Sequence, residues 1–332
     1  MLIFWDGKNL IKNRLEQHKI NCSKILAVFF MLFFLFIPFT PVQSIAQAAS
    51  KQVLFISSYS LDWDGFPKQL EGIKAEIDDS VEIKYIFMYG KYNTPKDANA
   101  RTHENVKFML KYVPKFDLII AGDDLALQFV LNNRQKYFKD TPVVFEGINS
   151  EEFATMAARD STVTGVVETF DFSDTIKVAK NLFPQATKVV GLSDDTETGH
   201  GSSQQFLKCQ KDFPQLQFSV LDASALNKNE LAAKLASYDH ETILLFLVFT
   251  KDKDGNFYNA REGVAFVTKY AKIPVFKGDE LGIMDGVLGG KLLSYREMGK
   301  TTGRIVMNIL NGTPAESIPI ETVAPKYVFN KD

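Results

Sequence analysis

Cysteine and histidine are scarce in this sequence, which has two Cys and four His among 332 residues. So few cysteines exclude a disulfide scaffold and a Cys-rich metal site, and the scattered His do not indicate a zinc centre. An excess of one charge is also lacking, because 38 Lys and Arg stand against 40 Asp and Glu, for a net charge of −2. Without a basic excess, we do not expect nucleic acid as a partner.

The remaining composition is that of an ordinary globular protein, with 45% hydrophobic and 23% charged residues. Neither short repeats nor low-complexity stretches interrupt it. The length predicts about two domains, each large enough for its own core.

One long hydrophobic run lies near the N-terminus. Residues 25–39 read ILAVFFMLFFLFIPF, and Lys19 and Lys24 precede them. The run is shorter than the roughly 20 residues of a spanning helix and fits the apolar region of a secretory signal. Because an Ala-Gln-Ala sequence follows at 46–48, we predict that residues 1–48 are a signal peptide cleaved after Ala48. The alternative is an uncleaved membrane anchor, against which the Ala-Gln-Ala site argues.

Cleavage there would change the charge and the thiol content. It would leave 33 basic and 38 acidic residues, a net charge of −5, and it would remove Cys22. Cys209 would then have no partner, which is compatible with an oxidising compartment. No Cys directly follows the apolar run, so we expect no lipid attachment. These features predict a soluble, monomeric protein of the bacterial periplasm.

The first half of the remaining chain alternates between short apolar runs and helical patterns. Phe66, Leu70 and Ile73, for example, recur at helical spacing between two such runs. The expected strands are 53–56, 81–89, 116–121 and 142–145. This alternation predicts a parallel sheet with right-handed crossovers and helices on both faces.

The same pattern restarts after a connecting segment at 163–169. Strands are expected at 188–192, 216–221, 243–249 and 274–276, and helices at 174–183, 202–213, 228–237 and 259–270. We therefore predict an α/β fold of two doubly wound parallel-sheet lobes. A strand at 292–295, a helix at 297–310 and the tail around Tyr327 could belong to either lobe.

Polar residues gather where the expected strands end. These sequences are SSYS at 57–60, GDD at 122–124, EGIN at 146–149, SDDTETGHG at 193–201, TKDKDG at 250–255 and KGDELG at 277–282. Ligands of open parallel sheets bind at the carboxyl ends of the strands. Two such edges that face each other would form a binding cleft.

Two motif-like sequences fail when their spacing is checked. Gly199-His200-Gly201 lacks the third glycine of a dinucleotide turn, since Gln204 stands there. The loop that starts at Asp252 resembles a calcium loop, but Phe257 and Gly263 replace the required Gly and Glu. We expect neither a cofactor nor a metal. The helix start near Ser202 could hold an anionic ligand group or could simply be capped.

Catalytic constellations are missing as well. The sequence has no GxSxG, SxxK or HExxH pattern, so we expect no enzyme activity. Trp63 and Tyr59 are the aromatic residues that could stack on a ligand at the mouth of a cleft. The alternative for Trp63 is packing within its own lobe.

Three segments and the C-terminal region resemble those of a known family. They are VLFISSYSLDWDGFPKQLEGI at 53–73, DLIIAGDDLALQFVLNNRQKYF at 117–138, TPVVFEGIN at 141–149 and the region 286–320. They are similar to ABC transporter substrate-binding proteins of the periplasmic-binding-protein type. The resemblance implies two lobes joined by three crossovers and a hinge that closes on the ligand. Lobe one would take 49–165 plus about 277–311, and lobe two 166–276 plus about 312–332.

The resemblance also implies a set of ligand-binding residues. Ser57 and Ser58 would bond the ligand, Tyr59 or Trp63 would cover it, and Asp123 or Asp124, with Asp194, would meet an ammonium group. The full set is Ser57, Ser58, Tyr59, Trp63, Asp123, Asp124, Glu146, Asn149, Asp194, Thr196, Asp254 and Asp279. The segment 277–280 departs from the aromatic residues expected there.

Two functions follow from the resemblance. The first is a solute-binding protein that delivers a small polar molecule to the permease of an ABC importer; aromatic amino acids are ligands of some relatives. The second is an extracytoplasmic receptor for a sensor kinase or cyclase. Since no output domain follows Asp332 in this sequence, we favour the first.

Overall fold

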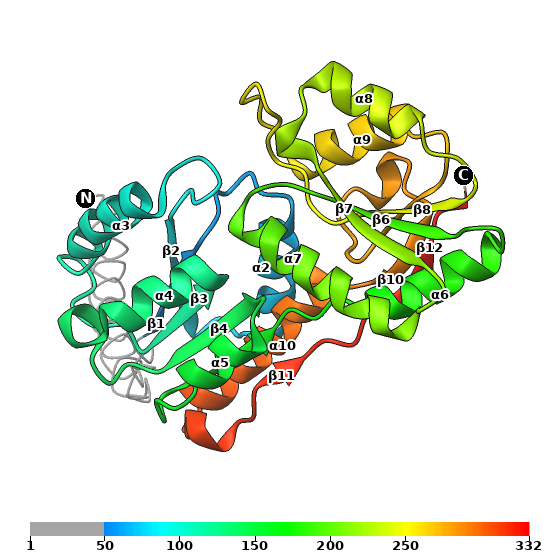
Figure 1. The fold of residues 1–332 in the computed structure, drawn as a ribbon. Helices are drawn as coiled ribbons and strands as arrows, with labels where there is room; N and C mark the ends of the chain where they lie inside the picture. Colours follow the sequence, from blue (N-terminus) through cyan, green and yellow to red (C-terminus); the bar gives the residue numbers. More distant parts are fainter. Residues whose placement is uncertain (1–49, 332) are drawn as a thin grey trace, which may run out of the picture. The chain divides into compact units, whose positions relative to one another are not determined.

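The computed structural model describes residues 50–331, the side chain of Glu197 excepted (Figure 1). The predicted signal peptide and its cleavage site lie outside the described residues. None of the described helices combines the length and the apolar character needed to cross a membrane. Residues 49–332 form one compact unit, which contains two six-stranded sheets.

The first sheet lies in lobe one and is parallel throughout, in the order β11-β5-β4-β3-β1-β2. Its strands are β1 (Lys51–Ser57), β2 (Val81–Phe87), β3 (Leu118–Gly122), β4 (Val143–Ile148), β5 (Val163–Val167) and β11 (Glu321–Thr322). The helices of this lobe are α2 (Gly65–Glu76), α3 (Pro95–Met109), α4 (Asp124–Asn132), α5 (Glu151–Ala157) and α10 (Tyr295–Leu310).

The second sheet lies in lobe two, in the order β12-β10-β9-β8-β6-β7, and only its β10–β12 pair is antiparallel. Its strands are β6 (Lys188–Ser193), β7 (Gln217–Asp222), β8 (Thr242–Phe246), β9 (Val275–Lys277), β10 (Gly289–Leu292) and β12 (Lys326–Phe329). The helices are α6 (Phe172–Leu182), α7 (Glu197–Lys208), α8 (Lys228–Ala236) and α9 (Ala260–Tyr270). The predicted α/β fold with two doubly wound lobes is confirmed.

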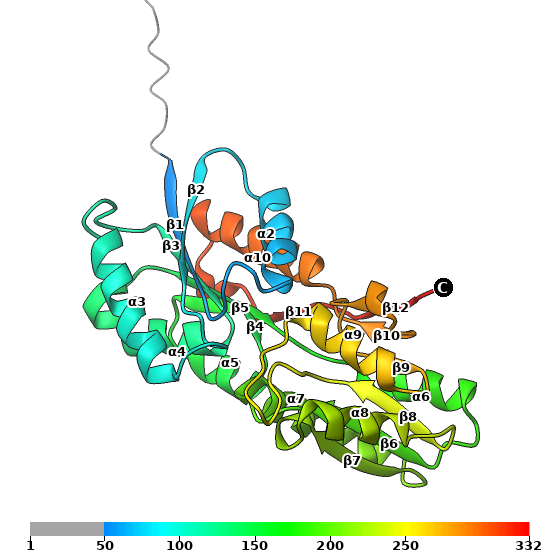
Figure 2. The same ribbon diagram turned by 90° about the horizontal axis from the view of Figure 1, so that it is seen from above.

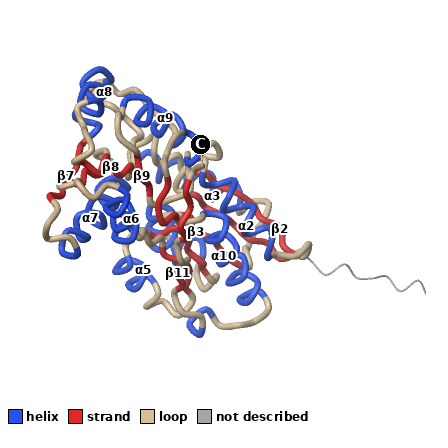
Figure 3. The backbone as a smooth tube through the Cα atoms, turned by 90° about the vertical axis from the view of Figure 1, so that its right-hand side faces the viewer, coloured by secondary structure: helices blue, strands red, loops and turns tan. Residues whose placement is uncertain are grey.

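Helices cover both faces of each sheet, so alternate residues of one strand enter different cores. Leu54 and Ile56 of β1 pack toward α3, α4 and α5, whereas Val53 and Phe55 pack toward α2 and α10 (Figure 2). In lobe two, α8 and α9 lie on one side of the strands and α6 and α7 on the other (Figure 3). Burial on both faces explains why these strands read as continuous apolar runs in the sequence.

Helices α2 and α10 approach each other unusually closely. A Cβ on Gly299 would lie 2.0 Å from the carbonyl oxygen of Gln69, and one on Gly72 would lie 2.1 Å from that of Arg296. Only glycine fits at such distances. The two helices, whose first residues are 230 positions apart in the chain, therefore pack backbone to backbone.

The chain passes between the two sheets three times, after β5, after β10 and after β11. The C-terminal boundaries differ from the expected ones at two places. Strands β9 and β10, which include residues 277 and 289–292, lie in the lobe-two sheet, and β11, at 321–322, lies in the lobe-one sheet. Long-range strand pairing decides both assignments, and local sequence patterns carry no information about it.

Three local elements also differ from expectation. Helix α7 begins at Glu197, five residues before the predicted start, because the Thr196 hydroxyl accepts a hydrogen bond from the Gly199 amide at 3.0 Å and caps it. The segment at 163–167, taken for a connection, is the buried strand β5. The short helix α5 at 151–157 was not predicted; the Ser150 hydroxyl caps it.

Candidate ligand-binding cleft

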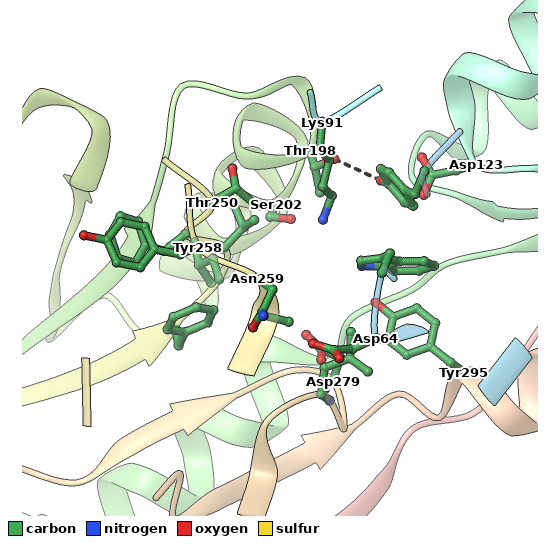
Figure 4. Close-up of a pocket in the computed structure, with 18 of the residues that line it drawn as sticks. Asp64, Lys91, Asp123, Thr198, Ser202, Thr250, Tyr258, Asn259, Asp279 and Tyr295 are labelled. Atoms are coloured by element: carbon green, nitrogen blue, oxygen red, sulfur yellow. Dashed lines mark hydrogen bonds between the residues drawn. The ribbon is translucent and has the colours of Figure 1, made fainter. Parts of the chain in front are cut away.

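A cavity of about 280 Å³ lies between the strand ends of the two lobes (Figure 4). In each sheet the strand order reverses at one point, between β1 and β3 in lobe one and between β6 and β8 in lobe two. The loops at these points line the cavity with Tyr59, Asp123 and Thr250. Ligands of doubly wound sheets bind where the strand order reverses, so the topology itself places this cleft.

A second, wider space of about 920 Å³ adjoins the first. The two spaces share part of their walls. The shared residues are Tyr59, Lys91, Asp123, Asn149, Glu168, Thr198, Val248 and Thr250. These shared residues, most of them polar, therefore stand between an inner cavity and an outer space.

Aromatic rings form much of the inner cavity. The rings of Tyr59 and Trp63 lie 4.5 Å apart, and Trp63 meets Tyr295 edge-on at 5.3 Å. From lobe two, Phe249 stacks on Tyr258 with ring centres 4.4 Å apart. Such walls bind planar apolar groups, with rings in offset or edge-to-face contact.

Two carboxyls of lobe one face the cleft, that of the buried Glu168 and that of the partly exposed Asp123. Asp123 precedes α4 with a φ of 75°, a conformation that residues other than glycine rarely adopt, and its Oδ1 accepts a hydrogen bond from the Asp124 amide at 2.9 Å. Burial and the neighbouring Asp124 raise the pKa of Asp123 to about 7. The Tyr295 hydroxyl donates to Glu168 Oε1 at 3.2 Å, and burial, followed by the charge of Asp123, raises the pKa of Glu168 well above its usual value.

The cleft also holds two lysines. Lys277 is buried and forms an ion pair with Asp279, whose other oxygen accepts from the Leu281 amide at 2.8 Å. Lys91 lies over the rings of Tyr59 and Trp63, with its Nζ 4.6 and 5.5 Å from the ring centres. Contacts of this kind stabilise a cation through the negative face of the ring.

Direct contacts join the lobes across the cleft. The Tyr59 hydroxyl lies 3.2 Å from the Thr198 hydroxyl, a hydrogen bond drawn in Figure 4. The Gln205 side chain donates to the Asn149 carbonyl at 3.2 Å. Nearby, Tyr92 of lobe one and Phe257 of lobe two bring their half-exposed rings to 5.7 Å.

The structure brings most, though not all, of the predicted site residues to this cleft. The inner cavity is lined by Tyr59, Trp63, Asp123, Asn149 and Asp279. Ser58, Asp124 and Thr196 line only the outer space. Four predicted residues line neither, namely Ser57, Glu146, Asp194 and Asp254.

The two serines after β1 serve the loop itself. Ser57 Oγ accepts from the Tyr59 amide at 3.3 Å. The Ser58 hydroxyl donates to the Gly122 carbonyl at 2.8 Å and accepts from the Ala126 amide at 2.9 Å. Since both hydroxyls are engaged with the backbone, their predicted role of bonding the ligand is not supported by this geometry.

The prediction that Asp194 meets an ammonium group is likewise not supported by the geometry. Its Oδ1 accepts hydrogen bonds from the amide and hydroxyl of Thr196, and its Oδ2 accepts from the amide and hydroxyl of Thr250. Asp194 is 4% exposed. The carboxylate is therefore satisfied inside lobe two, where it ties the loops after β6 and β8 together.

Glu146 and Asp254 fall outside the cleft for opposite reasons. Glu146 is fully buried in lobe one, and among the described residues neither of its oxygens has a partner in hydrogen-bond geometry, although Thr302 lies beside it. Asp254 is exposed in the turn after β8, where its amide donates to Asp252 at 3.0 Å. Alternation within β4 turns the Glu146 side chain toward α10.

Sequence reasoning missed several residues of the inner cavity. Glu168 follows β5, a strand that was not recognised, and Tyr295 begins α10. Further polar examples are Asp64, Lys91, Thr198, Thr250, Tyr258, Asn259 and Lys277, whereas Ser202 was considered as part of a possible anion site. Lys91 could have been found, since it lies in the loop after the predicted strand at 81–89. No group of three or more His, Cys, Asp or Glu among the described residues is arranged to hold a metal ion.

Comparisons with known proteins agree with this architecture. A curated relative, the tyrosine-binding protein of Clostridioides difficile (strain R20291), is 20% identical over 273 residues, which cover 81% of this chain and 74% of the relative. The structure of an ABC domain in complex with L-Trp from Streptococcus pneumonia superposes with a TM-score of 0.62 and 17% identity, covering 85% of this chain and 92% of that one.

A further structure, an ABC transporter solute binding protein from Agrobacterium vitis with bound allitol, has a TM-score of 0.59 and 11% identity, covering 85% of this chain and 96% of that one. At such identities the solved structures show the fold alone. The sequence profile of the ABC transporter substrate binding proteins matches residues 55–332. This chain belongs to that family.

Proposed function

We propose that this protein captures an aromatic amino acid, or a closely similar amine-bearing molecule, by closing its two lobes, and delivers it to an ABC importer. The observation that carries the proposal is the pairing of two carboxyls with an aromatic wall: Asp123 and Glu168 stand beside Tyr59 and Trp63. The carboxyls suit a ligand ammonium, and the rings suit a planar side chain.

The size of the site supports a small ligand. Small-molecule sites in proteins measure roughly 300–1,000 Å³, and the inner cavity, at about 280 Å³, lies just below that range. This volume suits a single amino acid better than a peptide or an oligosaccharide. The name of one relative, a tyrosine-binding protein, and the L-Trp complex of one solved neighbour favour the same class, while the neighbour from Agrobacterium vitis holds allitol.

The three connections between the lobes can act as a hinge about which the lobes close on the ligand. A ligand that contacts Asp123 in one lobe and Thr250 in the other binds the closed arrangement more tightly than an open one, so it shifts the population toward closure. The hydrogen bond between Tyr59 and Thr198 would belong to that closed state.

The first test is native mass spectrometry of the protein purified from its producing cells. We expect a co-purified, chemically unchanged amino acid, whose removal and rebinding change the fluorescence of Trp63, the one tryptophan after residue 48. Protein that carries no ligand and ignores a panel of amino acids would contradict the proposal. A bound compound released in altered form would indicate an enzyme instead.

The transport role and the export need tests of their own. Deletion of the gene should abolish uptake of the labelled ligand; unchanged uptake with a lost transcriptional response would favour the receptor for a sensor kinase. We also propose that residues 1–48 direct the chain to the periplasm. N-terminal sequencing of the exported protein should begin at Ala49, and an intact Met1 would contradict cleavage.

A further inference from the structure

The loop after β2, which carries Lys91, packs closely against the loop after β1. The Gly90 amide donates to the Ser58 carbonyl at 2.8 Å, and a Cβ on Gly90 would lie only 2.9 Å from that oxygen. Tyr89, just before it, has a φ of 57°. A non-glycine residue in the left-handed region is uncommon, and strained backbone of this kind often lies at a functional site. The loop thus places Lys91 in the wall that the inner cavity and the outer space share.

The ammonium group of Lys91 is short of partners. Among the described residues, no carboxylate lies within 4.0 Å of its Nζ and no acceptor is in hydrogen-bond geometry. The charge of this group instead faces the rings of Tyr59 and Trp63. Lys277, the other lysine of the cavity, differs because Asp279 pairs with it. Burial lowers the pKa of Lys91, against the opposing effect of Asp123 and more distant acids.

Lys91 is partly buried, and an ammonium group that has lost part of its water and has three unused donors is costly unless something binds to it. In Figure 4 the Lys91 side chain points toward the middle of the cavity, with Asp123 on the lobe-one side and Thr198 beside it. A ligand anion placed there would satisfy the donors with charge-assisted hydrogen bonds. The acids of the same wall would repel a ligand that carried only an anion. If the ligand also carried a cation, these acids would attract that group and offset the repulsion.

We propose that Lys91 selects for a carboxylate on the ligand, while Asp123 and Glu168 take the amino group, so that the cleft accepts zwitterionic amino acids and discriminates against the corresponding amines. This inference rests on the function proposed above and deepens it. The head group would lie at the shared wall, and the ligand side chain would enter the inner cavity beside Trp63 and Tyr295.

The test compares three ligands that differ only in their charged groups: tyrosine, tyramine, which lacks the carboxylate, and 3-(4-hydroxyphenyl)propionate, which lacks the amine. Affinities are measured by titration calorimetry for the wild type, Lys91→Met and Lys91→Arg. Lys96→Met is the matched control, because Lys96 is exposed at the start of α3 and lines neither space.

We expect Lys91→Met to weaken tyrosine binding about 10- to 100-fold, the loss of a charge-assisted hydrogen bond, and to leave tyramine binding no weaker. Lys91→Arg should keep the preference for tyrosine, and Lys96→Met should resemble the wild type. Unfolding transitions of all variants establish that each is folded.

Other outcomes overturn the inference. Equal weakening of tyrosine and tyramine in Lys91→Met would assign Lys91 a role in shaping the loop. Tighter tyrosine binding in that variant would mean that Lys91 competes with the ligand amine for the rings and acids. Wild-type protein that binds tyramine as well as tyrosine would also refute carboxylate selection, while leaving the aromatic ligand class intact. Wild-type protein that binds none of the three, nor the tryptophan series, would contradict the proposed function itself and this inference with it.

Discussion

Oδ2 of Asp194 accepts hydrogen bonds from both the backbone amide and the hydroxyl of Thr250, at 2.7 and 2.6 Å. The two residues are 56 positions apart and lie in the loops that follow the neighbouring strands β6 and β8. The sequence predicts Asp194 as a ligand contact, but in the structure this residue links the two cleft loops that follow β6 and β8.

Replacing Asp194 should therefore mainly lower the folding stability, and ligand affinity should change less. Asp194→Ala leaves four donors without an acceptor, two on the buried Thr250 and two on the part-buried Thr196, and we expect the free energy of unfolding to fall by about 3 kcal/mol. Asp254→Ala, an exposed acid in the same lobe, is the control and should stay within about 0.5 kcal/mol of wild type. Urea unfolding measures both. A stable Asp194→Ala protein that has lost its ligand would restore the sequence interpretation.

Ligand affinity should rise with pH between pH 6 and pH 8. A ligand ammonium binds the ionised form of Asp123, whose pKa is about 7 in the free protein. Below that pH a proton must first leave, so we expect about tenfold weaker binding at pH 6 than at pH 8. Titration calorimetry in two buffers of different ionisation enthalpy should detect the released proton.

The variant Asp123→Asn isolates this effect. It should bind more weakly at pH 8 and lose most of the pH dependence, because the side chain no longer titrates. A pH profile that is the same in Asp123→Asn and wild type would show that another group, such as Glu168, controls binding.

Glu146 should make the protein less stable as the pH rises. Burial raises its pKa from 4.5 to about 7 in the folded chain, so the folded state holds a proton that the unfolded state has lost between those values. The stability contribution is largest below pH 4.5, declines as the pH rises toward 7 and then levels off, a change of about 3 kcal/mol. Glu146→Gln removes this titration.

Unfolding at pH 5 and pH 8 measures the difference. The unfolding free energy of Glu146→Gln, taken relative to that of the wild type, should be higher at pH 8 than at pH 5, whatever the absolute stability of the variant. The exposed Glu152→Gln in α5 serves as the control and should show no such change. Parallel pH profiles for Glu146→Gln and wild type would mean that Glu146 is ionised in the fold at no cost.

The contact between α2 and α10 should not tolerate a methyl group. Gly299→Ala places a Cβ against the Gln69 carbonyl, and we expect a loss of about 2–3 kcal/mol in unfolding free energy. Asn308→Ala, on the exposed face of the same helix, should be nearly neutral. An unchanged stability for Gly299→Ala would show that the helices can move apart freely.

Local sequence patterns were sufficient for most of the fold. Continuous apolar runs such as that at 53–56 identify strands covered on both faces, and amphipathic spacing identifies the helices between them. Strand β5 was missed because Gly165 interrupts its apolar run. That glycine is required by close approach, since a Cβ there would lie 2.1 Å from the Phe145 carbonyl oxygen.

The sequence by itself determined the alternation of strands and helices, the two lobes and the loops that reach the cleft, because each of these follows from short-range periodicity. Only the tertiary structure decided which polar side chains face the ligand. Asp123 directly follows β3 and Asp194 directly follows β6, each beside the point where the strand order of its sheet reverses. One nevertheless borders the cavity, while the other is surrounded by donors from Thr196 and Thr250. It also decided that Lys91 lies beside Tyr59 and that β10 and β11 belong to opposite sheets. Those outcomes depend on contacts between residues far apart in the chain, which local patterns do not encode.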